Sequence, residues 1–81
     1  MNRIQYIKYL AKEYRELEEE REELQDILDI CKLSDQDIKE IDHDLAMIDS
    51  EIFDITLEMR GAAPSKYMIE KYNLHDILAL D

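Results

Sequence analysis

A glutamate and a histidine three residues apart, Glu40 and His43, match a spacing that metal-binding helical bundles use. In di-iron bundles, a Glu-x-x-His pair points both side chains into the bundle core. In this sequence Ile41 fits the apolar seam of its helix, so Glu40 and His43 are expected to face outward. The sequence therefore predicts no metal site at this pair.

The lone cysteine, Cys31, is the second group with possible chemistry. To act as a nucleophile it would need a base such as His43, and both side chains would have to leave their expected helix faces to meet. No third group that could orient the histidine is evident. Because Cys31 fits a seam position, we expect a small core residue that stays reduced, which favours a cytoplasmic protein.

The remaining candidates lack the context that their chemistry needs. Asp42, Asp44 and Asp49 do not lie in a loop with the glycine turn of a calcium-binding EF-hand. His75, beside Asp76, is expected at the surface of a short terminal helix. The sequence has neither a glycine-rich phosphate loop nor a nucleophile elbow. We therefore expect a protein that is not an enzyme and that carries no cofactor.

Acidic residues are the dominant feature of the composition. The chain has 21 acidic and 10 basic residues, for a net charge of −11, and residues 13–58 alone carry a net −14. Within residues 16–23, six carboxylates lie along about 12 Å of helix, close to the spacing of about one charge per 1.7 Å in duplex DNA. Two interpretations stay open: a surface that mimics DNA, or a solvated face that keeps the protein in solution.

This charge limits the classes of partner. Nucleic acids and anionic membranes are disfavoured because both carry the same sign of charge. No apolar run approaches the ~20 residues of a membrane span, and no signal peptide is expected at the start. A basic protein surface or a second copy of the chain remains. The predicted partner-binding residues point away from the seam: Glu16, Glu19, Glu22, Glu23, Asp26 and Asp29.

Two runs of apolar residues in steps of three and four must position these side chains. The first run is Ile7, Leu10, Tyr14, Leu17, Leu24, Leu28 and Cys31, and the second is Ile38, Ile41, Leu45, Ile48, Ile52, Ile55 and Met59. This rhythm is typical of a coiled-coil seam. It predicts an all-α fold in which residues 1–60 form an antiparallel two-helix coiled-coil hairpin, with helices at about 3–32 and 35–60. Ser34 can cap the second helix and Gly61 is expected to end it.

The two runs also predict which residues face each other. In an antiparallel pair, facing residues have numbers with a constant sum, and a sum of 69 pairs Cys31 with Ile38 and Leu24 with Leu45. Arg21 interrupts the first run and falls opposite Ile48. The same register places Arg21 among four carboxylates and brings like charges together on the flanks of the seam. We expect Arg21 to neutralise these neighbours: Glu18, Glu20, Asp49 and Glu51. The alternative is that Arg21 specifies the register of the helices or binds an acidic group of a partner.

The rest of the chain is expected to cover the hairpin. Residues 61–65 are expected to form a linker, and residues 66–81 a short C-terminal helical cap. Within this segment Ser65 can begin a first short helix, which Asn73 is expected to end. A second apolar stripe on the second helix contains Ala46, Phe53 and Leu57, with Met47 nearby. We expect the C-terminal segment to pack on this stripe, so that the second helix is buried on two sides. A homodimer is a further way to cover it.

Residues 33–48 also resemble part of a known family. The stretch Asp42-His43-Asp44-Leu45-Ala46 occupies the positions of a Ser-Gln-Glu-Leu-Asp signature. It is similar to the small two-helix aspartyl-phosphate phosphatases of sporulation regulation. The serine and the final aspartate of that signature are absent here, so no activity is carried over.

Two functions follow as expectations. The first is a small acidic regulator or inhibitor that docks a basic surface of a target, such as a nucleic-acid enzyme or a DNA-binding protein. In size and charge the chain is similar to small acidic helical inhibitors encoded by phages, an analogy of composition alone. The alternative is a structural coiled-coil protein that associates with itself.

Overall fold

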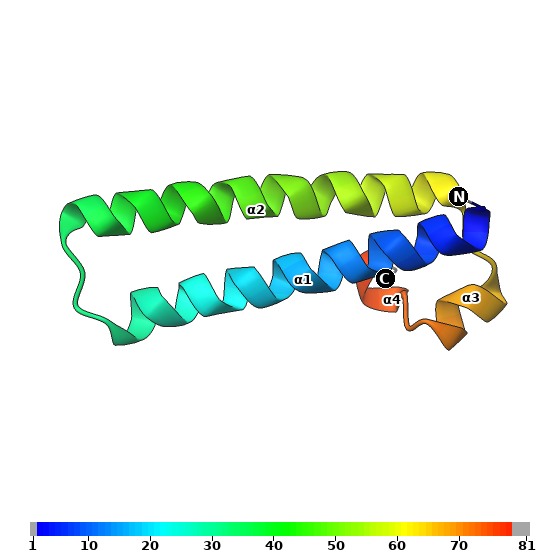
Figure 1. Ribbon diagram of the computed structural model, residues 1–81, viewed down its shortest axis with the longest axis horizontal. Coiled ribbons are helices and arrows are strands. Elements are labelled where there is room, and N and C mark those ends of the chain that lie inside the picture. The colour runs from blue at the N-terminus through cyan, green and yellow to red at the C-terminus, as the bar shows by residue number, and fades with distance from the viewer. Residues whose placement is uncertain (1, 79–81) are drawn as a thin grey trace.

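Two long helices dominate the computed structural model, which describes residues 2–78 (Figure 1). Helix α1 spans Arg3–Ile30 and α2 spans Asp35–Ala62, and they run antiparallel. The short helices α3 (Lys66–Lys71) and α4 (His75–Leu78) follow, and they lie at the end of the hairpin where the chain begins. We call that end the base, and the opposite end, with the loop of residues 31–34, the tip. The predicted all-α hairpin is confirmed.

Serine side chains begin two of the helices, as the sequence predicts. The Ser34 hydroxyl accepts a hydrogen bond from the backbone N–H of Asp37 at 3.2 Å, at the start of α2. The Ser65 hydroxyl accepts one from the N–H of Met68 at 3.3 Å, at the start of α3. Each bond satisfies an N–H that has no partner inside its helix.

The end of α2 differs from the prediction. Gly61 does not stop the helix, which continues through Ala62, and Ala63 takes the left-handed conformation with φ 48°. The reason is a distant side chain: the Arg3 guanidinium donates hydrogen bonds to the carbonyl oxygens of Ala62 (3.1 Å) and Ala63. These bonds satisfy terminal carbonyls that a glycine motif would otherwise serve. Pro64 follows, and proline cannot continue a helix.

The buried core gathers at the base of the hairpin. Its side chains come from α1, from the end of α2 and from the C-terminal segment: Ile7, Leu10, Ala11, Tyr14, Met59, Met68, Leu74, Ile77 and Leu78. α1 contributes four of these residues, whereas α2 has two buried residues in all. The prediction that the second helix is buried on two sides is therefore wrong. At the base, α1 is the helix that is covered on two sides, by α2 and by the C-terminal segment. The small side chain of Ala11 allows the C-terminal segment to pack closely against α1.

The tip half of the seam is covered less well. Leu24, Leu28, Ile41 and Leu45 lie between the helices but are only half-buried, because two helices alone leave both sides of their seam open. The outermost predicted layer does not form. Cys31 is exposed, so its predicted place in the core is wrong. α1 ends at Ile30, and the extended backbone of Cys31 leads into the loop.

The second stripe of α2 stays open to solvent. Phe53 is 61% exposed and Leu57 is 47% exposed, so the prediction that the C-terminal segment covers them is wrong within residues 2–78. α4 does pack on α2, but its apolar side chains join the core beside α1. Arg60 fixes this position by donating two hydrogen bonds, at 3.1 and 3.3 Å, to the carbonyl oxygen of Leu78.

Candidate protein-docking surface

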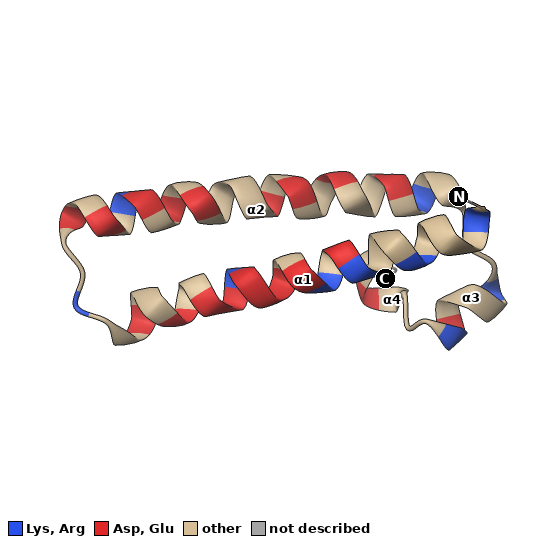
Figure 2. Cartoon of the chain, in the orientation of Figure 1, with Lys and Arg blue, Asp and Glu red and all other residues tan. Residues whose placement is uncertain are grey.

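The outer face of α1 carries the six predicted partner-binding residues, and every one is exposed: Glu16, Glu19, Glu22, Glu23, Asp26 and Asp29. α1 is an unbroken α-helix through this region, so the charge spacing expected from the sequence is realised. Figure 2 shows the resulting separation along α1, with basic residues near the base and acidic residues toward the tip. We call these six residues the acidic face.

Little of this charge is neutralised within the chain. Among residues 2–78, two ion pairs form: Lys12 with Glu16 at 3.9 Å and Arg21 with Asp49 at 2.7 Å. One further member of the acidic face, Asp29, accepts a hydrogen bond from the Gln25 amide at 3.3 Å. The Lys12 and Glu16 side chains are more than half exposed, so their pair is screened by solvent.

A second group of carboxylates lies where α1 and α2 meet. A groove of about 370 Å³ is lined by Glu13, Glu51, Asp54 and Glu58, together with apolar residues of the seam. The Tyr6 hydroxyl donates a hydrogen bond of 2.7 Å to Glu58 Oε2 and so relieves one of these charges. The same hydrogen bond raises the pKa of Tyr6. Among the like charges predicted beside the seam, Glu13 and Glu58 thus line one groove.

The four arginines of the chain each hold two parts of the structure together. Arg21 joins α1 to α2 through Asp49. Arg3 binds the C-terminal carbonyls of α2, Arg15 binds those after α3, and Arg60 binds that of α4. A cation at the C-terminal end of a helix also interacts favourably with the helix dipole. These contacts span up to 60 residues of sequence, so local pattern alone does not reveal them.

One buried tyrosine has a strongly shifted pKa. Burial, followed by hydrogen bonding to Glu18 and the charges of Glu18 and Asp76, raises the pKa of Tyr14 to about 12. Its hydroxyl also lies 3.5 Å from the carbonyl oxygen of Asp76. Each of these neighbours favours the neutral phenol over the phenolate. Tyr14 therefore acts as a packing residue of the base and not as an acid at ordinary pH.

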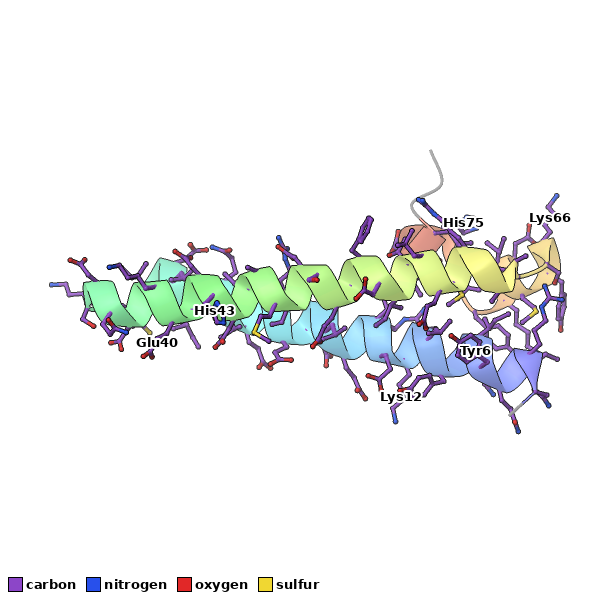
Figure 3. The ribbon with its side chains drawn as sticks, turned by 90° about the horizontal axis from the view of Figure 1, so that it is seen from above. Tyr6, Lys12, Glu40, His43, Lys66 and His75 are labelled. Carbon is purple, nitrogen blue, oxygen red and sulfur yellow. The ribbon has the colours of Figure 1, made fainter. Side chains whose placement is uncertain are left out.

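The other residues considered from the sequence lie apart from this surface. Glu40 and His43 are exposed on the tip half of α2, and His75 is exposed on α4 (Figure 3). Within residues 2–78, no group of three or more His, Cys, Asp or Glu side chains is arranged to hold a metal ion. None of the helices in this part of the chain is both long and apolar enough to span a membrane.

Comparison of the chain with protein-family models, with curated proteins and with solved structures finds no match. Two surfaces stand out: the acidic face of α1 and the exposed apolar stripe of α2.

Proposed function

We propose that this chain is a small acidic regulator that inhibits or modulates a target protein by docking on its basic surface. The acidic face of α1 is the docking site. The observation that carries the proposal is the exposure of all six carboxylates of this face, of which Glu16 alone forms an ion pair within residues 2–78. Opposite potentials across an interface speed and orient docking.

The spacing of the charges suggests the class of target. Within residues 16–23 of α1, six carboxylates follow the helix at nearly the charge density of duplex DNA. A protein with a DNA-binding groove, such as a nucleic-acid enzyme, presents a complementary surface. We therefore propose action as a DNA mimic, in the manner of a phage inhibitor. The cytoplasm is the proposed compartment, since the exposed Cys31 stays reduced there.

A capture experiment tests this proposal. The parent chain is compared with a variant in which Glu19, Glu22 and Glu23 become Gln and Asp26 becomes Asn. A control variant removes the same number of charges from exposed positions of α2, by the corresponding changes at Glu40, Asp42, Asp44 and Asp54. Immobilised chains are exposed to host lysate, and retained proteins are identified by mass spectrometry.

We expect a basic, DNA-binding protein that the parent and the control retain, that the α1 variant loses, and that duplex DNA displaces. Retention of the same proteins by the α1 variant would contradict docking through the acidic face. Circular dichroism of all three chains checks that helix content is unchanged, as expected for substitutions at exposed positions.

Self-association is the second candidate function, and the α2 stripe favours it. Phe53, Leu57 and Met47 are each about half exposed or more. Such a stripe can pack against its copy in a four-helix arrangement. Light scattering over a range of protein concentrations measures this directly: a stable dimer that Phe53→Ser and Leu57→Ser disrupt would favour the structural function.

A further inference from the structure

A groove of about 480 Å³ lies at the base of the molecule, between the first half of α1 and the end of α3. Its volume falls in the range of small-molecule sites, roughly 300–1,000 Å³. The lining residues are Lys8, Ala11, Lys12, Arg15, Glu16, Glu19, Lys71, Tyr72 and Asn73. Four of these side chains are basic and two are acidic, so the groove is locally positive in a chain of net charge −11.

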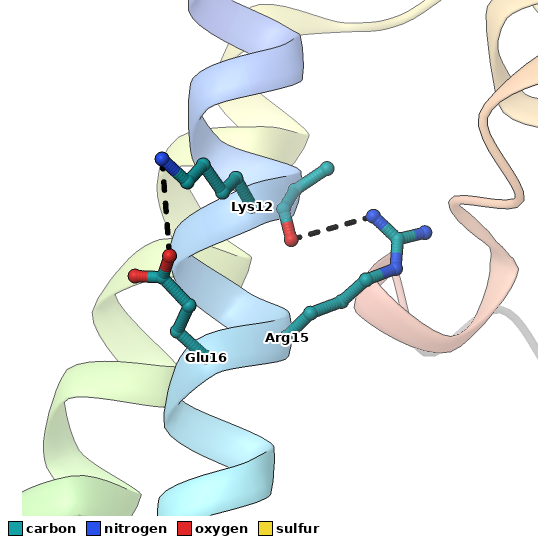
Figure 4. A network of polar contacts seen from close by, with 4 residues as sticks. Lys12, Arg15 and Glu16 are labelled. Carbon is teal, nitrogen blue, oxygen red and sulfur yellow. Dashed lines mark hydrogen bonds and ion pairs between the residues drawn. The ribbon is translucent and has the colours of Figure 1, made fainter.

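A tertiary contact fixes one wall of the groove. Nη2 of Arg15 donates hydrogen bonds to the carbonyl oxygens of Tyr72 at 2.8 Å and Asn73 at 3.3 Å. Nη1 of the same guanidinium donates to the carbonyl oxygen of Ala11 at 3.4 Å (Figure 4). Asn73 is in the left-handed conformation, φ 53°, which turns the chain sharply after α3. The end of α3 is thereby held against α1.

Two ammonium groups converge on one aromatic ring in this groove. Nζ of Lys8, from α1, lies 5.8 Å from the centre of the Tyr72 ring, and Nζ of Lys71, from α3, lies 5.6 Å from it. Neither lysine forms an ion pair within residues 2–78. Nζ of Lys71 also lies 5.4 Å from the centre of the Tyr67 ring, and hydrogen bonding to Tyr67 raises the pKa of Lys71. Two positive charges near one ring, neither of them paired with a carboxylate among these residues, favour a bound anion.

The donors that remain free favour phosphate over carboxylate. Carboxylates are recognised best by the planar fork of an arginine, but both terminal nitrogens of Arg15 already bind backbone carbonyls. Lysine ammonium groups act as point charges and suit the oxygens of a phosphate. The groove is also larger than a phosphate ion needs, and the half-buried Tyr72 offers apolar surface for an organic group.

We propose that this groove binds a small organic phosphate, with Lys8 and Lys71 holding the phosphate and the organic group lying against Tyr72. The site is at the base of the molecule, and Glu16 and Glu19 of its lining also belong to the acidic face. The proposed phosphate contacts come from Lys8 and Lys71, which lie outside the acidic face, so this site can be present whether or not the proposed regulatory function holds.

The probes for the test are 1-naphthyl phosphate, 1-naphthoate, which has the same ring with a carboxylate, and inorganic phosphate. Each is titrated into the ¹⁵N-labelled full chain, and amide shifts are followed by NMR. The site variant is Lys8→Gln with Lys71→Gln. The matched control is Lys32→Gln with Lys39→Gln, which removes two charges near the tip.

We expect saturable shifts for residues 8–15 and 71–73 with naphthyl phosphate, and binding at least about tenfold weaker with naphthoate and with inorganic phosphate. The site variant should bind naphthyl phosphate at least about tenfold more weakly than the parent, and the control within about twofold of it. Absence of saturable shifts, equal binding of naphthoate, or equal weakening by the control variant would overturn the proposal.

Discussion

Nε of Arg21 lies 2.7 Å from Oδ1 of Asp49, and this ion pair joins α1 to α2 in the tip half of the hairpin. Arg21 interrupts the apolar run of α1, and Asp49 follows Ile48, the residue predicted to face it. Ile48 is buried although its predicted partner is an arginine. The arginine that interrupts the apolar run therefore forms an ion pair between the two helices, in a region where carboxylates outnumber basic residues.

Replacing Arg21 with Leu should make the stability of the protein more dependent on salt. The variant loses one cation among crowded carboxylates, and salt screens the repulsion that remains. We expect a loss of a few tenths to about 1 kcal/mol at low salt, since the pair is half exposed, and recovery at high salt. Thermal melts over a salt series measure this. Lys39→Leu is the control for net charge; if its salt slope equals that of Arg21→Leu, the ion pair has no special role.

Alanine substitutions along the seam should cost less toward the tip. Leu10 is 2% exposed in the core at the base, so Leu10→Ala should cost about 2–5 kcal/mol. Leu24 is only half-buried, and Leu24→Ala should cost less than half as much. Urea unfolding of both variants measures the difference. Equal costs would show that the tip half is covered in solution, as a dimer would cover it.

The sequence predicts the hairpin and the pairing of its helices because both depend on local apolar periodicity. It also predicts the starts of α2 and α3, because each begins next to its own capping serine. The Arg21–Asp49 pair also follows from the register. The exposed carboxylates of α1 were predictable for the same reason, since a helix face is set by spacing.

Distant contacts that do not follow from the register of the two long helices were not predictable. Arg3 sets the end of α2, and a local glycine rule points to Gly61 instead. The C-terminal segment could pack on the α2 stripe or on the face of α1 that includes Ala11, and it packs on the α1 face. Nothing in the sequence around Ala11 indicates that this residue is buried by the C-terminal segment. The basic groove escaped prediction because its walls come from α1 and α3.

Tyr14 should make the protein less stable above pH 10. Its pKa is about 12 in the folded chain and about 10 when unfolded, so the unfolded chain releases the proton first. The associated stabilisation is complete below pH 10 and is lost as the pH rises toward 12. Tyr14→Phe removes this ionisation. Between pH 9 and 12, the free energy of unfolding of the parent should fall by about 2 kcal/mol more than that of the variant. Parallel pH profiles would show that Tyr14 is not responsible.

The most direct test of the proposed regulatory function is the salt dependence of binding to the captured target. Calorimetric titrations compare the parent with the variant changed at Glu19, Glu22, Glu23 and Asp26, at low and high ionic strength. Because screening weakens contacts between opposite charges, the parent should bind at least about tenfold more tightly than the variant at low salt, and the two should converge at high salt. Equal affinities at low salt would contradict docking through the acidic face and would direct attention to Phe53 and Leu57.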